Sequence, residues 1–372
     1  MTTTATESSC RVRVATEAFQ DIAERGLMGS PSRSPMPTLI CAAIEISGAR
    51  LSISGTNASL WTKAWTEQTD NLGGQDFRCL VSAARLKQIV GHITGPTCVI
   101  ELLDETLRIA DDAGEWNVPV SSGEHPPTPE GEYEEFVKAT ANSIAASLRV
   151  GSAMSSETTR FAIHGLSLEH TGTTARFTST DDRRIHFRDL AKMKSKARHW
   201  IIAAEAVSVM KSVLKGDDEI SIEVSNQAVR LTIGDFSMAS LLVEGSFPPY
   251  DGIVKDARNS ENMLTADRVA MLAAIDRVSM MGDVGRGVRL GIAKDKLTIR
   301  ACDPEFGEGK TTINATATQS LDYGINSRFL KDAVAMSDSV EVPIKFSKAT
   351  APLYIDCGSG FVAVVQGCAL HG

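Results

Sequence analysis

The chain has 372 residues, of which 42% are hydrophobic and 23% are charged. This chain is longer than one ordinary hydrophobic core can serve, which favours two or three domains of about 100 to 150 residues each. The composition is typical of a soluble globular protein. With 46 acidic and 38 basic residues the net charge is −8, which taken alone argues against nucleic acid as a partner.

The first residues, MTTTATESSC, contain no basic region followed by an apolar one, and no window of the chain reaches the length of a membrane span. We therefore expect a cytoplasmic protein without a membrane segment. The seven cysteines form an odd set without a CxxC pair and without a histidine at ligand spacing. This pattern favours free thiols over a disulfide framework or a metal site.

Two breaks divide the chain. Proline, glycine and glutamate dominate residues 121–133, which indicates a linker. In the second break, LLVEGSFPPYDGIV from Leu241, Pro248 and Pro249 cannot donate to a sheet ladder. The strand is therefore expected to stop near Phe247, and the chain to continue in an extended path. These breaks predict domains at 1–130, 131–254 and 255–372.

The three segments repeat one pattern of elements. A first helix is predicted at 16–25, 142–150 and 265–280, and a second in VSAARLKQIVGHI, IAAEAVSVMKSVL and INSRFLKDAVAMS, with Ser82 as an N-cap. Asn57, Asp181 and Asp303 follow equivalent strands and are spaced 124 and 122 residues apart. Alternating strands close each segment. The simplest account is three copies of one α+β unit, each with two helices and several antiparallel strands.

Several motifs could carry chemistry, but each has a structural alternative. GEGKTT at 307–312 contains the Gly-Lys-Thr of a phosphate-binding loop, yet Pro304 stands where that loop needs glycine, so a β-hairpin turn is the better interpretation. Asp181 and Asp182 could act as an acid/base pair, but Asn57 and Asp303 hold equivalent positions, which favours a turn role. The histidines are scattered. We predict no catalytic residue, no cofactor and no bound metal.

Basic residues gather on the predicted helices, while Lys192, Lys194, Lys196 and Arg198 alternate in a predicted loop. Helices that carry positive charge would reconcile the net charge of −8 with a polyanionic partner. The residues on or beside the helices that we expect to face such a polyanion are Arg25, Arg85, Lys87, Arg149, Lys211, Lys215, Arg268, Arg277 and Lys331.

Four stretches together resemble one known family. They are LLVEGSFPPYDGIV, RFAIHGLSLEHTGTTARFTSTDDRRIHFRD, RGVRLGIAKDKLTIRACDPEFGEG and YGINSRFLKDAV, and in this order they look like the bacterial DNA polymerase III beta subunit, the sliding clamp. The resemblance implies DNA-clamp domains with antiparallel sheets outside and two helices per domain inside. It also implies a head-to-tail homodimeric ring that holds double-stranded DNA without reading its sequence.

The resemblance also implies partners and sites. The expected partners are the DNA polymerase III catalytic subunit, the clamp loader and other proteins with a clamp-binding motif. Trp116, Val118 and Met280 resemble the residues that meet at the dimer interface. The positions that match the family's partner-peptide pocket are Ile163, Thr180, Arg184, Ile185, Pro248, Ile253, Asn326, Phe329, Val364, Val365 and Leu370.

The chain departs from the family pattern at this pocket. Asp181-Asp182-Arg183-Arg184 stands where the family has Asp-Gly-His-Arg, Phe329 replaces a tyrosine, Gly252 replaces an arginine, and the C-terminal residues differ. Because the resemblance covers nearly the whole chain, we still expect a non-enzymatic replication clamp. The alternatives are a divergent clamp-like dimer that does not serve the main replicase, and a nucleotide-using enzyme built on GEGKTT.

Overall fold

The computed structural model describes residues 10–73, 75–281, 287–303 and 307–368. The chain forms two compact units: unit 1 comprises Met1–Asn142 and Ser208–Leu242, and unit 2 comprises Ser143–Val207 and Val243–Gly372. Helices α3 (Ala141–Ser147) and α5 (Ala204–Val213) each contain a point at which the chain passes from one unit to the other.

Unit 1 is built on two antiparallel sheets. Among the described residues these have the strand orders β5-β1-β7-β8-β9 and β10-β15-β16-β17-β4-β3-β2-β6. The strands are β1 (Cys10–Ala15), β2 (Cys41–Ser47), β3 (Arg50–Thr56), β4 (Leu60–Thr66), β5 (Thr69–Gly73), β6 (Phe77–Ser82), β7 (Thr97–Leu103), β8 (Thr106–Ala110), β9 (Glu115–Pro119), β10 (Glu134–Thr140), β15 (Glu219–Val224), β16 (Ala228–Ile233) and β17 (Phe236–Leu241).

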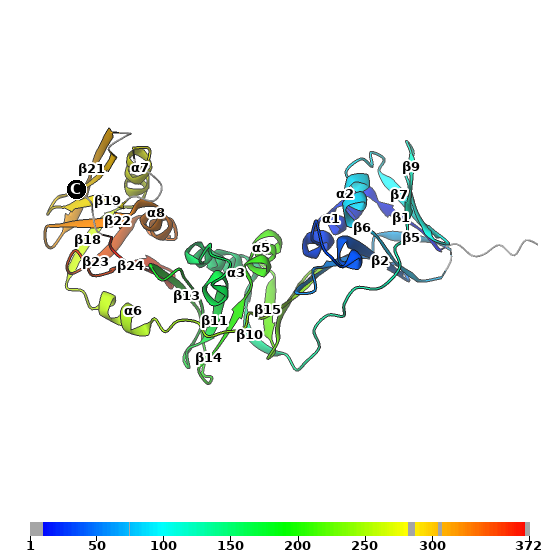
Figure 1. Cartoon of the computed structure of the whole chain (residues 1–372), viewed down its shortest axis with the longest axis horizontal. Coiled ribbons are helices and arrows are strands. Elements are labelled where there is room, and N and C mark those ends of the chain that lie inside the picture. Colours follow the sequence, from blue (N-terminus) through cyan, green and yellow to red (C-terminus); the bar gives the residue numbers. More distant parts are fainter. Residues whose placement is uncertain (1–9, 74, 282–286, 304–306, 369–372) are drawn as a thin grey trace, which may run out of the picture. The chain divides into compact units, whose positions relative to one another are not determined.

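Helices α1 (Thr16–Gly26) and α2 (Ala83–Val90) lie side by side in unit 1, and the short 3-10 helices η1 (Leu27–Gly29) and η2 (Pro37–Ile40) follow α1 (Figure 1). The apolar face of α1 packs on β3 and β4, where Phe19 and Ile22 are buried. Gly26 is needed there, because a Cβ at this position would lie 2.3 Å from the carbonyl oxygen of Ile53. The core therefore lies between the helices and one face of the eight-stranded sheet.

Unit 2 contains one continuous sheet. Among the described residues its strand order is β14-β11-β12-β13-β25-β24-β23-β18-β21-β20-β19-β22. The strands are β11 (Leu166–His170), β12 (Thr174–Thr180), β13 (Arg184–Lys192), β14 (Arg198–Ile202), β18 (Asn262–Asp267), β19 (Gly287–Ile292), β20 (Lys296–Asp303), β21 (Gly307–Ala317), β22 (Leu321–Asn326), β23 (Glu341–Phe346), β24 (Leu353–Gly358) and β25 (Phe361–Val365).

The remaining helices of unit 2 are η3 (Leu148–Ala153), α4 (Phe161–His164), α6 (Asp251–Arg258), α7 (Arg268–Ser279) and α8 (Ser327–Ala335). Helix α7 packs on β20 and β21, α8 packs on β22, β24 and β25, and η3 packs on β12 and β13. Helix α6 lies in the connection from β17 to β18 and contacts β23 and β24 (Figure 1). None of the described helices is long and apolar enough to cross a membrane.

The predicted order of elements is confirmed, because each third of the chain runs strand, helix, a set of strands, a second helix and three closing strands. The domain boundaries themselves stay a prediction. The predicted N-cap is confirmed as well: the hydroxyl of Ser82 accepts a hydrogen bond from the Arg85 backbone N–H. The amide oxygen of Asn326 caps α8 in the same way.

Four predictions of local structure are corrected. The helix expected at 265–280 begins at Arg268, because the preceding residues pair in β18. The helix expected at 142–150 ends as α3 at Ser147 and continues as η3. The strand expected to reach Phe247 ends at Leu241, and the extended path beyond Tyr250 is helix α6. GEGKTT does not form a turn but begins β21, paired with β20.

Candidate functional site: a buried arginine at the β13–β25 pair

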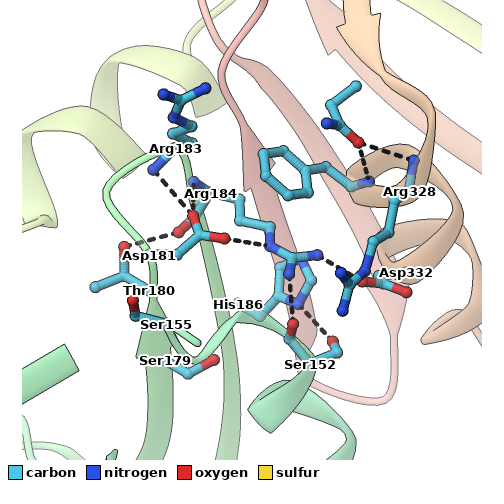
Figure 2. A network of polar contacts seen from close by, with 12 residues as sticks. Ser152, Ser155, Ser179, Thr180, Asp181, Arg183, Arg184, His186, Arg328 and Asp332 are labelled. Carbon is cyan, nitrogen blue, oxygen red and sulfur yellow. Dashed lines mark hydrogen bonds and ion pairs between the residues drawn. The ribbon is translucent and has the colours of Figure 1, made fainter. Parts of the chain in front are cut away.

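Arg184 is the centre of a polar network in unit 2 (Figure 2). Its side chain is 3% exposed, and each guanidinium nitrogen donates a hydrogen bond. Nε donates to Asp181 Oδ2 at 2.9 Å, Nη1 to Asp332 Oδ2 at 2.6 Å, and Nη2 to the Ser152 carbonyl oxygen at 2.6 Å. A buried charge is tolerated only when it is paired and hydrogen-bonded, so this arginine is held rigidly.

The loop before β13 places the first partner of Arg184. Asp181 Oδ1 accepts the backbone N–H groups of Arg183 and Arg184 at 3.0 and 3.1 Å, and its other oxygen accepts Arg184 Nε. Asp182 has a φ of 71° and pairs with Arg160. Both carboxylates are therefore bound by arginines or backbone, which confirms their turn role and argues against an acid/base pair.

The imidazole of His186 lies beside the polar network of Arg184. His186 is fully buried on β13, and its Nδ1 lies 3.0 Å from the Ser152 hydroxyl oxygen. Burial, assisted by the positive charge of Arg184, lowers the pKa of His186 to about 3. The imidazole is therefore neutral at physiological pH, which makes it a structural histidine and not a general base.

Strand pairing and helix α8 bring several predicted pocket residues together. Arg184 faces Val365 and Ile185 faces Val364 across the β13–β25 pair. The Arg184 guanidinium carbon lies 4.2 Å from the centre of the Phe329 ring. The Thr180 hydroxyl donates to the Arg184 carbonyl oxygen at 2.7 Å. Asn326 caps α8 directly before Phe329.

The segment before α6 is fastened to the same sheet. Phe247, Tyr250 and the partly buried Val254 pack in one apolar cluster with Ile185 and Val364. The Tyr250 hydroxyl donates to Glu169 Oε2 at 2.5 Å and lies 3.0 Å from the Thr178 hydroxyl oxygen. Burial raises the pKa of Glu169 above its usual range. These contacts position Pro248, between the two aromatic residues, and Ile253, beside Val254.

The predicted pocket residues differ in accessibility. The side chains of Ile163, Thr180, Arg184, Ile185, Val364 and Val365 are buried in the free chain. Pro248, Asn326 and Phe329 are half-buried, and Ile253 is 49% exposed. Leu370 lies outside the described residues. Residues of this site that sequence analysis did not predict are Ser152, Asp332, Phe247 and Tyr250.

Two family models match the chain. Residues 140–249 match "DNA polymerase III beta subunit, central domain", and residues 257–360 match "DNA polymerase III beta subunit, C-terminal domain". Together these matches span more than half of the sequence. The chain belongs to the DNA polymerase III beta subunit family.

The chain is similar to members of this family over most of its own length and of theirs. The beta sliding clamp of Pseudomonas aeruginosa is 24% identical over 319 residues, covering 83% of this chain and 86% of that protein. The DnaN sliding clamp of Bartonella birtlesii, solved bound to griselimycin, has a TM-score of 0.89 at 23% identity and covers 97% of this chain and 100% of its own. The clamp of Bacillus subtilis has a TM-score of 0.88 at 18% identity, covering 98% and 100%.

The chain is therefore a DNA sliding clamp, a non-catalytic processivity factor of DNA polymerase III. The comparisons do not favour the divergent interaction protein that was the alternative. The nucleotide-using enzyme is not supported either, because GEGKTT lies on β21 and the next element is strand β22, whereas a phosphate-binding loop leads directly into a helix.

The basic residues predicted to face DNA lie on or beside helices of this clamp. Three of them carry ion pairs: Arg25 with Asp21 and Asp235, Arg149 with Asp338, and Lys331 with Asp276. Arg268 is half-buried at the start of α7. The remaining members are exposed to solvent: Arg85, Lys87, Lys211, Lys215 and Arg277.

The residues predicted at the subunit interface of the clamp lie on two elements. Trp116 and Val118 are on β9, the last strand of the five-stranded sheet, and Val118 is 6% exposed. Met280 follows α7 and is 77% exposed. Met280 and the half-buried Trp116 can thus offer apolar surface to a partner, whereas the Val118 side chain is already covered.

The cysteines have no ligand or redox partners in the described part of the chain. Cys41, Cys79, Cys98, Cys302, Cys357 and Cys368 are free thiols. Burial raises the pKa of the Cys79, Cys98 and Cys357 thiols to about 12, which makes them poor nucleophiles. Among the described residues, no group of three His, Cys, Asp or Glu side chains is placed to hold a metal ion.

Proposed function

We propose that this clamp works as a cytoplasmic, head-to-tail homodimeric ring of three domains per subunit, 1–130, 131–254 and 255–372. The ring would encircle double-stranded DNA and recruit the polymerase catalytic subunit, the clamp loader and other proteins with a clamp-binding motif. What supports recruitment best is that Pro248, Ile253 and Phe329 stay accessible and could form an apolar rim, while the residues paired at β13–β25 are buried and could form its floor.

The rim and floor suit an apolar peptide side chain. A partner side chain that covers Ile253 would remove an exposed aliphatic group from water, and the well-packed floor would not need to rearrange. The guanidinium of Arg184 is already engaged by Asp181, Asp332 and the Phe329 ring. Arg184 therefore supports Phe329 from below and is not available to pair with a peptide carboxylate.

Ring closure would use surfaces that a single chain leaves uncovered. Strand β9 ends its sheet, so its outer edge can accept a strand from a second copy, and such pairing would protect the edge. The exposed Met280 fits an apolar contact at the same kind of interface.

DNA contact would depend on a few helices and not on the whole surface. The net charge of −8 excludes a uniformly positive protein, but exposed cations such as Lys87 on α2 and Arg277 on α7 can line a hole. Arg25, Arg149 and Lys331 are partly neutralised by neighbouring carboxylates, so we expect them to contribute less.

The proposal is tested with a fluorescent peptide that carries a bacterial clamp-binding motif, together with the mass of the protein in solution. We expect saturable binding to a dimer and loss of binding in Ile253→Asp. Val340→Asp is the matched control, because Val340 is an apolar residue of the same unit that is 77% exposed. A dimer that does not bind the peptide, or equal loss in both variants, would contradict the proposed pocket. A monomer at all concentrations would contradict the ring.

A further inference from the structure

Unit 1 contains a cleft that the proposed function does not use. Its volume is about 660 Å³, within the range of ligand and peptide sites. The floor is formed by β3, β4, β16 and β17, and the wall by the linker from Glu124 to Pro129. Trp61 and Lys63 alternate along β4 with the buried Leu60 and Ala64, so the cleft lies on the face of the sheet opposite α1.

The cleft sits at the counterpart of the β13–β25 pair. In unit 1, β4 and β17 pair Trp61 with Ala239 and Lys63 with Ser237. In unit 2, β13 and β25 pair Ile185 with Val364 and Phe187 with Val362. Trp61 and Ile185 are separated by 124 residues, the same spacing that relates Asn57 to Asp181. The two strand pairs are therefore equivalent positions of the repeat.

The two positions are filled differently. In unit 2 the four paired residues are covered by Phe247, Tyr250 and Val254 of the chain's own connecting segment. In unit 1 the linker places His125, three prolines and Thr128 at the cleft in place of two aromatic rings, and the floor residues Ser237 and Ala239 are small. The space that side chains occupy in unit 2 thus remains open in unit 1.

The wall of the cleft is fixed in place. The indole Nε1 of Trp61 donates to the Pro126 carbonyl oxygen at 2.9 Å, and His125 Nε2 lies 3.1 Å from the carbonyl oxygens of Thr38 and Cys41. Tyr133 contributes an aromatic side, with the Arg230 guanidinium carbon 3.9 Å from its ring centre. A ligand would therefore enter a site that is already ordered.

Among the described residues, one cation of the cleft has no direct ion pair. Lys63 pairs with Glu45 at 2.8 Å, and Arg230 pairs with Glu223 at 2.7 Å. The Arg78 guanidinium lines the cleft, is exposed, and has no side-chain hydrogen bond or ion pair with a described residue, although its charge helps to lower the pKa of Glu45, its neighbour across the β2–β6 pair. The remaining carboxylate of the lining is Glu124, which is exposed on the linker.

We propose that this cleft is a second docking site, which binds a short acidic peptide segment of a partner protein. An aromatic or aliphatic side chain of the peptide packs on Trp61 and Ala239, in the space that Phe247 and Tyr250 fill in unit 2. A peptide carboxylate pairs with Arg78. The site lies in unit 1, so it is independent of the pocket proposed at Ile253.

The test uses three labelled hexapeptides with one apolar core, the acidic EELPFE, the uncharged QQLPFQ and the basic KKLPFK. Binding is measured in the Ile253→Asp background, which silences the proposed pocket in unit 2. We expect saturable binding of the acidic peptide, about fivefold weaker for the uncharged one. The NMR signal of the Trp61 indole N–H, identified by its loss in Trp61→Phe, should shift on binding.

Variants of the cleft make the result specific. Arg78→Glu should reverse the preference toward KKLPFK, Glu124→Gln should strengthen binding of EELPFE, and Ser237→Phe should abolish binding by filling the cleft. Arg13→Glu, an exposed charge reversal on β1 of the other sheet, is the matched control. The same Arg78→Glu substitution in the wild-type chain should leave binding of the clamp-motif peptide unchanged, which separates the two proposals.

The proposed cleft site is wrong if the Trp61 signal does not shift at millimolar EELPFE. It is also wrong if Arg78→Glu and Arg13→Glu affect binding equally, since a general charge effect would then explain the preference. Retained binding in Ser237→Phe would place the peptide elsewhere on the surface.

Discussion

The guanidinium carbon of Arg184 lies 4.2 Å from the centre of the Phe329 ring, which ties β13 to helix α8. The contact is one side of an almost fully buried guanidinium whose other partners are Asp181, Asp332 and the Ser152 carbonyl oxygen. Because this cation is almost completely shielded from water, the position of Phe329 depends on the carboxylates that hold Arg184.

Removing one of those carboxylates should destabilise the fold. Asp332→Asn leaves Arg184 buried with one charged partner fewer, so we expect a loss of about 1–2 kcal/mol in the free energy of unfolding. Asp276→Asn is the matched control, because Asp276 pairs with Lys331 where both side chains are about half exposed, and it should cost about 0.5 kcal/mol or less. Urea denaturation of both variants measures the difference. Equal midpoints would contradict the structural role of the Arg184 pair.

Phe329 should matter for peptide binding through its ring. Phe329→Tyr keeps the aromatic face over Arg184, so binding of a clamp-motif peptide should change by less than about threefold. Phe329→Ala removes the ring from the rim of the proposed pocket and should weaken binding about tenfold or more. Titration by fluorescence anisotropy compares them. If the alanine variant binds as the wild type does, Phe329 is not part of the rim.

Much of the fold follows from the sequence, because its signals are local. The apolar spacing and the Ser82 cap of α2 predicted that helix within two or three residues of its ends, and the alternating strands that close each third of the chain are confirmed. The repeat predicted that Asp181 ends a strand as Asn57 does, and the Oδ1 atoms of both accept backbone N–H groups of the turn. Such interactions span only a few residues.

The predictions that failed depend on contacts between distant segments. The apolar run after Leu241 suggested that β17 continues. Instead, the Leu242 N–H donates to the Gln227 carbonyl oxygen and the next N–H, of Val243, donates to the Ile201 carbonyl oxygen, so pairing with β16 ends here. Helix α6 follows two prolines and is polar on most sides, so the apolar periodicity of the sequence does not predict it. Periodicity also cannot predict that Arg184 pairs with Asp332 on a helix far along the chain.

The proposed DNA lining predicts a particular salt dependence. Reversal of Lys87, Lys211 and Lys331 to glutamate should weaken DNA binding. It should also make the logarithm of the association constant fall less steeply with the logarithm of the salt concentration, because fewer counterions are released. Reversal of Lys331 alone should have the smallest effect, since its ammonium already pairs with Asp276 at 2.6 Å. Reversal of Lys192, Lys194 and Lys196 changes the net charge equally and serves as the control. An identical slope for both triple variants would show that these three lysines do not line the DNA-binding hole.

Two glycines should respond oppositely to alanine. Gly252 lies in α6, where an added Cβ meets nothing within 4 Å, so Gly252→Ala should stabilise the chain by up to about 1 kcal/mol. At Gly165 the added Cβ would lie 2.5 Å from the Ile202 carbonyl oxygen, so Gly165→Ala should lower the melting temperature clearly. Thermal unfolding distinguishes them. A destabilised Gly252→Ala would show that the glycine serves a contact made only in an assembly.

His186 predicts how stability changes with pH. Its pKa is about 3 in the folded chain and near the ordinary 6.5 when unfolded, because burial disfavours the imidazolium. Between these values the unfolded chain binds the extra proton, so this contribution to stability is complete above about pH 6.5. It falls by about 1.4 kcal/mol per pH unit as the pH drops toward 3. The raised pKa of Glu169 acts in the opposite direction, so the comparison must be made between variants.

The measurement is the slope of unfolding free energy against pH from pH 7 to pH 4, from urea denaturation. His186→Asn lowers stability at every pH because it disturbs the core, but its slope should be flatter than that of the wild type. If His186→Asn and the wild type have parallel slopes, His186 takes up a proton without unfolding. The polar network around Arg184 must then admit a second positive charge, and its rigidity would be disproved.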